Sequence, residues 1–180
     1  MKLIVALIAC LSIASISHAQ EFWAKGKGYE YGFSEINGWV GIGQDLENFP
    51  QADLVFYAAE RKGEDIKIRH PYTDLYIFSN VTTGAADAFW KELETRYRKA
   101  SQKLIVKYTS DINISRGLSA KVIYFFNIGA ENKTQAIASI PNSGRIVSLV
   151  MQASSEMLLR EHVPEFAQLV RTYKTSGAGK

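Results

Sequence analysis

The chain is poor in the residues that build cross-linked or reactive sites. Its 180 residues include one cysteine, three histidines and four prolines. A single cysteine excludes an internal disulfide framework and a cysteine-ligated metal cluster, because both need at least two thiols. The formal charge of +3 lacks the strong basic excess of a nucleic-acid-binding domain, so we expect no nucleic-acid partner. With 47% hydrophobic and 22% charged residues, the composition is that of a globular protein.

The first 19 residues have the pattern of a secretory signal peptide. Lys2 supplies a positive charge, an apolar run extends from Leu3 to about Ile16, and Ala19 is a small residue at the expected cleavage site. We expect cleavage between Ala19 and Gln20 and a periplasmic or secreted mature protein. The apolar run is shorter than the ~20 residues that span a bilayer, so we expect no membrane-spanning segment after cleavage.

Cys10 leaves one alternative open. Leu7-Ile8-Ala9-Cys10 resembles a bacterial lipobox, in which the cysteine becomes the lipidated first residue. Only nine residues precede Cys10, and the apolar run continues beyond it, which favours the cleaved form without lipid. The leader also contains Lys2 and no acidic residue, so its removal lowers the formal charge by one unit and leaves no thiol.

The remaining chain is predicted to be one domain. We expect a globular domain over residues 20–174, followed by a flexible tail of small and polar residues over 175–180. Neither a repeat nor a linker divides this stretch. A chain of this size buries roughly 68–70% of its surface, so its core alone can stabilise a monomer.

The hydrophobic pattern predicts two groups of strands. Residues 20–28 precede the first strand as a short irregular segment. The pair Asn37-Gly38 predicts a hairpin between strands at 29–36 and 39–43. Further strands are predicted at 53–60, 65–69, 75–78, 104–109, 118–128, 134–140 and 145–152.

A helix is predicted between the two strand groups. Thr83 or Gly84 is the expected N-cap. Phe89, Leu93 and Tyr97 recur at i, i+4 and i+8, which forms one apolar stripe. Charged residues fill most of the remaining positions, so the opposite face of this helix is expected to contact solvent.

A second helix is predicted to close the chain, from Ser155 as N-cap to about Tyr173. Pro164 is expected to kink this helix or to divide it near His162. Hairpin-length connections between the strands favour antiparallel pairing. The sequence therefore predicts an α+β fold, with a largely antiparallel sheet flanked by helices.

This order of elements resembles the PsbP-like superfamily. The resemblance rests on Gly38-Trp39 after an early strand, the paired strands over 53–69, and the closing strand and helix. Arg145-Ile146-Val147-Ser148-Leu149-Val150 and the stretch from Phe166 to Tyr173 match it best. That superfamily includes photosystem II extrinsic PsbP proteins and bacterial exported proteins of the DcrB type. The resemblance implies an α/β/α sandwich and a non-catalytic accessory role at a membrane-associated machine, and it carries over no site residue.

The sequence offers little for catalysis or metal binding. The stretch from Gly117 to Lys121 lacks the second glycine of a nucleophile elbow. After cleavage, His70 and His162 are the only histidines, too few and too far apart for a metal cluster. His162 and Glu165 share a helix face at i, i+3, which a solvated surface explains. We expect no catalytic residue, no metal site and no cofactor, with a hydrolase as the less favoured alternative.

Two further motifs have structural interpretations. Gly26 to Gly32 has the composition of a phosphate loop, but the spacing is one residue too long and a strand follows it. Asn80, Asn113 and Asn132 begin N-x-Ser/Thr sequons, which matter only in a eukaryotic secretory pathway. Turn positions explain Asn113 and Asn132 without glycosylation.

Aromatic residues are dense in the first half of the chain. The residues concerned are Trp23, Trp39, Tyr57, Tyr72, Tyr76 and Phe78. We assign most of them to the core, because a sheet needs large side chains to fill it. A partly exposed aromatic groove for a peptide, glycan or lipid is the alternative.

These observations favour an exported, non-catalytic accessory protein of the bacterial envelope that binds a protein or envelope component through a sheet face or edge. A carrier of a small lipid or glycan, with a pocket between sheet and helix, remains a second hypothesis. The identity of the partner or ligand is not encoded in any motif.

Overall fold

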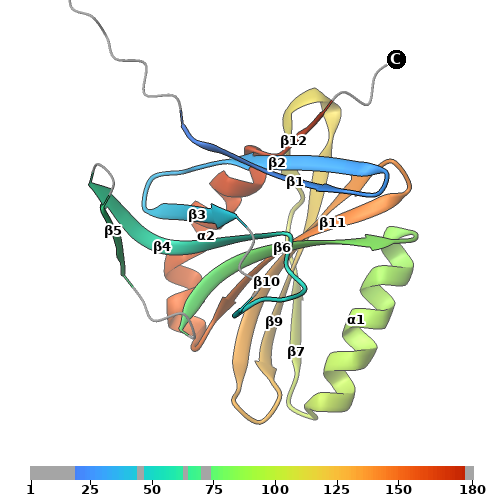
Figure 1. Ribbon diagram of the computed structural model, residues 1–180. Coiled ribbons are helices and arrows are strands. Elements are labelled where there is room, and N and C mark those ends of the chain that lie inside the picture. Colours follow the sequence, from blue (N-terminus) through green and yellow to red (C-terminus); the bar gives the residue numbers. More distant parts are fainter. Residues whose placement is uncertain (1–18, 44–46, 63–64, 70–73, 177–180) are drawn as a thin grey trace, which may run out of the picture.

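The computed structural model of the protein describes residues 19–43, 47–62, 65–69 and 74–176 (Figure 1). Residues 1–18 of the expected 19-residue leader, with Cys10, lie outside these ranges. His70 and Tyr72 lie outside them as well.

Nine of the described strands form one antiparallel sheet, the large sheet. Its main path runs β3-β4-β6-β11-β10-β9-β7, with β5 paired to β4 and β8 paired to β9. The strands are β3 (Trp39–Gly43), β4 (Leu54–Lys62), β5 (Asp65–Ile68), β6 (Leu75–Thr83), β7 (Ile105–Tyr108), β8 (Ile112–Asn113), β9 (Ser119–Ile128), β10 (Lys133–Asn142) and β11 (Arg145–Ala153). A short 3₁₀ helix at Ser115–Gly117 separates β8 from β9.

The hairpin between β10 and β11 shows how the sequence sets this register. Asn142 pairs with Arg145, and the two residues between them, Ser143 and Gly144, have φ angles of +46° and +77°. Two successive positive φ angles give a turn whose twist matches that of the strands. The hairpin therefore brings two long, almost fully buried strands together at the centre of the sheet.

One face of the large sheet is covered by α2 (Glu156–Arg171) and by a small second sheet (Figure 1). The small sheet has the order β1-β2-β12, with β1 (Glu21–Gly26), β2 (Tyr29–Ser34) and β12 (Lys174–Thr175). Tyr31 ties the two sheets together: its hydroxyl donates to Asp53 at 2.9 Å and lies 2.8 Å from the hydroxyl of Ser79. This face holds most of the buried hydrophobic residues of the core.

The closing helix begins as predicted. The Ser155 side chain accepts a hydrogen bond from the Leu158 amide at 3.2 Å. Pro164 lies inside a single helix, so the predicted division near His162 is wrong. The lost backbone hydrogen bond is outweighed because the following turn buries Phe166 against the core.

The opposite face carries α1 (Ala86–Ala100). Trp90 and Leu93 are its buried residues, and the Trp90 indole donates to the Ser139 hydroxyl at 3.1 Å. The predicted cap at Thr83 or Gly84 is wrong: the N-cap is Ala85, which makes no side-chain hydrogen bond. β6 continues through Thr83, because pairing with β11 extends to that position.

The predicted hairpin between strands at 29–36 and 39–43 is wrong. β2 pairs with β1 and β12 in the small sheet, whereas β3 pairs with β4 in the large one. Gly38, with φ +82°, does make a turn, and the Trp39 amide donates to the Ile36 carbonyl at 3.2 Å. That turn passes the chain from one sheet to the other.

The ends of the chain also differ in detail from the expectation. Most of residues 20–28, expected to be irregular, form β1, which pairs with β2 along its whole length. Thr175, the first residue of the expected tail, belongs to β12 and pairs with Tyr31 of β2. The prediction of an α+β fold with a largely antiparallel sheet between two helices is confirmed.

Candidate functional site

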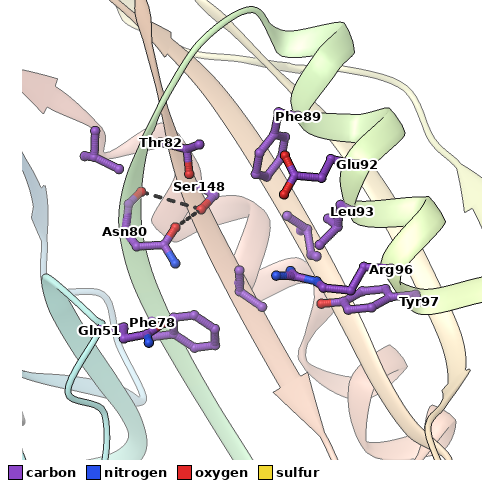
Figure 2. Close-up of a pocket in the computed structure, with 13 residues that line it drawn as sticks. Gln51, Phe78, Asn80, Thr82, Phe89, Glu92, Leu93, Arg96, Tyr97 and Ser148 are labelled. Carbon is purple, nitrogen blue, oxygen red and sulfur yellow. Dashed lines mark hydrogen bonds between the residues drawn. The ribbon is translucent and has the colours of Figure 1, made fainter. Parts of the chain in front are cut away.

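On the face that carries α1, the central strand β6 is only partly covered, and β11 beside it is buried. α1 packs over β9 and β10, while Phe49 packs over the other side, with its ring 4.6 Å from that of Tyr76. Between them lies a groove of about 330 Å³, which we call the α1 groove (Figure 2). Its lining residues are Gln51, Phe78, Asn80, Val81, Thr82, Phe89, Glu92, Leu93, Arg96, Tyr97, Ile137, Ser148 and Val150.

The floor of the groove follows from strand alternation. Phe78 and Asn80 lie on one face of β6 and are opposite Val150 and Ser148 on β11. Ser148 is buried and hydrogen-bonded to the carboxamide oxygen of Asn80, and it lies 3.5 Å from the Asn80 backbone carbonyl. No acceptor among the described residues takes the Asn80 side-chain N–H groups, so they are available to a ligand.

α1 forms one wall of the groove, with residues three and four apart on its inner side. Phe89 and Leu93 are apolar, while Glu92 and Arg96 place a carboxylate and a guanidinium at the rim (Figure 2). The Arg96 guanidinium carbon lies 5.6 Å from the centre of the Tyr97 ring. The groove therefore offers aromatic surface, an amide donor and both signs of charge.

A line of polar side chains crosses the sheet beside the groove. The Tyr97 hydroxyl donates to the Gln135 carbonyl oxygen at 2.5 Å, and the Gln135 amide donates to Gln152 at 2.8 Å. The Gln152 amide in turn donates to the Tyr76 hydroxyl. Burial raises the pKa of both Tyr97 and Tyr76, so both hydroxyls keep their protons at neutral pH. The line ties α1 to β10, β11 and β6 through neutral hydrogen bonds.

His162, one of the candidate bases, lies on α2 and does not line the α1 groove. Its imidazole Nδ1 is paired with the Glu165 carboxylate, which also accepts from the Trp39 indole at 2.9 Å. Arg69 lies 3.9 Å from the same carboxylate and donates to the Gly38 carbonyl. His162 is thus buried in a cluster that joins α2 to β3, rather than on the solvated surface that the sequence predicted.

Glu165 is the charged centre of that cluster. Burial alone would raise its pKa, but hydrogen bonds from His162 and Trp39 and the nearby charge of Arg69 outweigh this effect and lower the pKa. The carboxylate is therefore ionised at neutral pH, where it fixes the orientation of the imidazole and the indole. The cluster braces two elements of the core.

Some of the aromatic residues that were predicted to fill the core do so, and others do not. Trp39 and Tyr57 are buried in the core, whereas Trp23 is 40% exposed. Phe78 lies on the floor of the α1 groove, and Tyr76 lies beside it. Asn80, read from the sequence only as the start of a sequon, is a floor residue of the groove. The predicted strand at 75–78 ended before Asn80, whereas β6 continues to Thr83 and places Asn80 beside Phe78 on the same face.

Within the described ranges, no group of three or more His, Cys, Asp or Glu side chains is placed to hold a metal ion. None of the described helices is both long and apolar enough to cross a bilayer.

Comparison with solved structures identifies the fold class. CyanoP, the cyanobacterial PsbP of Synechocystis sp. PCC 6803, superposes with a TM-score of 0.51 at 14% identity, over 94% of this chain and 99% of CyanoP. LpqN of Mycobacterium tuberculosis, a protein involved in cell envelope biogenesis, aligns with a TM-score of 0.49 at 15% identity, over 89% and 92% of the two chains. No protein-family model and no curated protein matches the sequence. The fold is PsbP-like, and the resemblance seen in the sequence is confirmed at the level of the fold.

Proposed function

We propose that the protein is an exported, non-catalytic accessory protein of the cell envelope that binds a segment of a partner protein in the α1 groove. The observation that carries this proposal is the partly covered face of β6. The central strands of a sheet are ordinarily covered, yet here Phe78 and Asn80 stay half-buried between two walls, beside the buried Ser148 hydroxyl.

The chemistry of the groove favours a peptide over a lipid. A lipid site needs a closed apolar cavity, whereas this groove is open and carries Glu92 and Arg96 at its rim. Asn80 offers hydrogen-bond donors of the kind that a peptide carbonyl accepts. Phe78 and Phe89 offer the apolar contacts that a side chain of the partner requires.

The export route is part of the proposal. Cleavage between Ala19 and Gln20 would leave one residue before β1, which begins at Glu21. The mature domain would then begin one residue before the first described strand, and Cys10 would leave with the leader. The intact mass of the mature protein tests this step, because a lipidated Cys10 would retain residues 10–19 and add a diacylglyceryl group.

Site-specific photocrosslinking in the envelope of the native host tests the groove. Thr82 lines the groove and is exposed, while its neighbour Thr83 is equally exposed and does not line it. A photoreactive residue at Gln51, on the opposite wall, should crosslink to one partner protein. Thr82→Trp should abolish that crosslink by filling the groove, and the matched variant Thr83→Trp should preserve it. Crosslinking that survives Thr82→Trp, or none at all from Gln51, contradicts the proposal.

A small-ligand carrier is the second candidate, because the groove lies between helix and sheet as such a pocket would. Native mass spectrometry of the protein purified from its host distinguishes the two. A non-covalent adduct of small mass that disappears in Thr82→Trp and remains in Thr83→Trp would replace the protein-partner proposal with the carrier.

A further inference from the structure

β7 ends the large sheet, and one of its edges faces outward. Among the described strands, β7 pairs only with β9, with Ile105 opposite Phe126 and Tyr108 opposite Ile123. The α1 groove lies elsewhere, because β10 and β9 separate β7 from β11. An outer strand of this kind presents unpaired N–H and C=O groups to any chain that approaches it.

One hydrogen bond shows which backbone groups point outward. The Thr109 amide donates to the Val122 carbonyl at 3.2 Å, which makes these two residues a hydrogen-bonded pair. Such pairs alternate along an antiparallel ladder, so Lys107 and Ile105 also bond to β9. The N–H and C=O groups of Val106 and Tyr108 therefore point away from β9. An incoming strand could form hydrogen bonds with the donor and the acceptor of each of these two residues.

The side chains at this edge are unusually exposed for apolar residues. Ile105 is 46% exposed and Tyr108 is 63% exposed. The Tyr108 hydroxyl donates to Glu94 at 3.2 Å, which holds the ring against the end of the sheet. An added strand would cover both side chains.

The charges around β7 are mostly positive. Lys103 and Lys107 form no ion pair with any described residue, and Lys121 lies 5.8 Å from the centre of the Tyr108 ring. Glu94, the acid that Tyr108 contacts, is already paired with Arg98 at 2.5 Å, and Asp111 follows β7 by three residues. A second copy added edge to edge would bring lysines of like charge together, which is unfavourable. An acidic partner segment would be attracted.

We propose that β7 accepts an extended acidic segment of a partner protein as an additional strand. The backbone groups of Val106 and Tyr108 supply the hydrogen bonds, and Lys103, Lys107 and Lys121 select for acidic side chains. This surface is independent of the α1 groove, so either proposal can fail without the other. The alternative explanation for Lys107 is that its charge prevents any strand from pairing with this edge.

Amide hydrogen exchange measured by NMR tests the geometry directly. The probe is an acetylated hexapeptide in which aspartate and valine alternate, and the control replaces aspartate with lysine. Saturating acidic peptide should slow exchange at Val106 and Tyr108 by about tenfold or more, while Lys107, already bonded to β9, stays unchanged. Absence of binding at millimolar peptide, or slowed exchange around Asn80 and Thr82 in place of β7, overturns the proposal.

Paired variants separate the backbone effect from the side-chain effect. Tyr108→Pro and Tyr108→Ala both remove the ring, but only proline removes the outward N–H. Tyr108→Pro should therefore weaken peptide binding about tenfold more than Tyr108→Ala. Lys107→Glu should weaken binding, whereas Lys25→Glu, the same change on exposed β1, should not. Equal binding within either pair, or tighter binding by Lys107→Glu, contradicts the proposal and indicates a protected edge.

Discussion

Glu165 provides a quantitative test of how α2 is attached to the rest of the fold. Its carboxylate is bonded to the His162 imidazole on the same helix and to the Trp39 indole on β3. Arg69 adds a third contact at 3.9 Å, but both partners are about one-third exposed, so solvent screens that pair. The change Glu165→Gln keeps the size and one acceptor and removes the charge.

The expected cost follows from the two hydrogen bonds. A bond to a charged group contributes roughly 1 kcal/mol more than a neutral one, so Glu165→Gln should lower the free energy of unfolding by about 2 kcal/mol at neutral pH. For a domain of this size, that change lowers the melting temperature by about 4–8 °C. Glu161→Gln is the matched control, because Glu161 is exposed on the same helix and should change stability by less than about 0.5 kcal/mol.

The effect should depend on pH with a defined sign. The pKa of Glu165 in the folded protein is lower than its ordinary value of 4.5. A lowered folded-state pKa means that ionisation stabilises the folded protein above pH 4.5 and that this contribution is lost as the pH falls through the folded-state value. Urea unfolding of the wild type and Glu165→Gln should give a difference that is present between pH 7 and about 5 and shrinks toward pH 3. A difference that persists undiminished at low pH, or that is absent at pH 7, refutes this account of the cluster.

Three other changes test separate parts of the fold. Trp90→Ala removes the largest buried side chain of α1 and should lower the free energy of unfolding in urea by about 3–5 kcal/mol. A decrease below about 1 kcal/mol would mean that Trp90 does not anchor α1 to the sheet. Tyr31→Phe removes the partner of the buried Ser79 hydroxyl and one of two tyrosine hydroxyls that donate to Asp53, since Tyr29 remains at 3.2 Å. It should cost about 1–3 kcal/mol, and an unchanged urea midpoint would contradict a stabilising role for this hydroxyl. Ser143→Gly relieves a φ of +46° and should stabilise by about 1 kcal/mol, raising the melting temperature by about 2–4 °C, whereas a lower value would contradict the turn geometry.

The elements that could be predicted are those in which local signals agree. Ser155 begins α2 as a cap, and the apolar residues that follow recur at helical spacing. The strands β9, β10 and β11 are long and apolar, so their existence and order follow from the sequence. In each case propensity, capping and burial favour the same structure, and the antiparallel α+β arrangement follows from them.

Strand pairing at the start of the domain could not be predicted. Asn37-Gly38 is a strong local signal for a hairpin, and the turn does form at Gly38. Its two flanking strands belong to different sheets, because β2 pairs with β1 and buries Tyr31 and Phe33 in the core, while Trp39 bonds to Glu165. The partner of β2 within the small sheet, β12, is distant in the sequence, and no local pattern specifies such a contact.

The candidate site was beyond the reach of sequence reasoning for the same reason. Asn80 and Ser148 are 68 residues apart and meet only because β6 pairs with β11. Neither residue is reactive, so a search for catalytic or metal-binding motifs does not detect them. Phe78, Asn80 and Thr82 share one face of β6, but the predicted strand ended at residue 78, so the sequence did not place the last two on that face.

The two faces of the large sheet differ in the side chains that β11 contributes to them. On the α2 side, alternate positions of β11 are apolar, as Val147, Leu149 and Met151 show, and they are sealed by a helix and a second sheet. On the α1 side, the intervening positions include Ser148 and Gln152, which are buried but polar. Buried polar groups destabilise a core unless they form hydrogen bonds. Here Ser148 bonds to Asn80 on the floor of the groove, and Gln152 bonds to Gln135 beside it. The groove proposed as the binding site therefore lies on the face where β11 carries polar side chains, whereas the α2 face holds most of the apolar core.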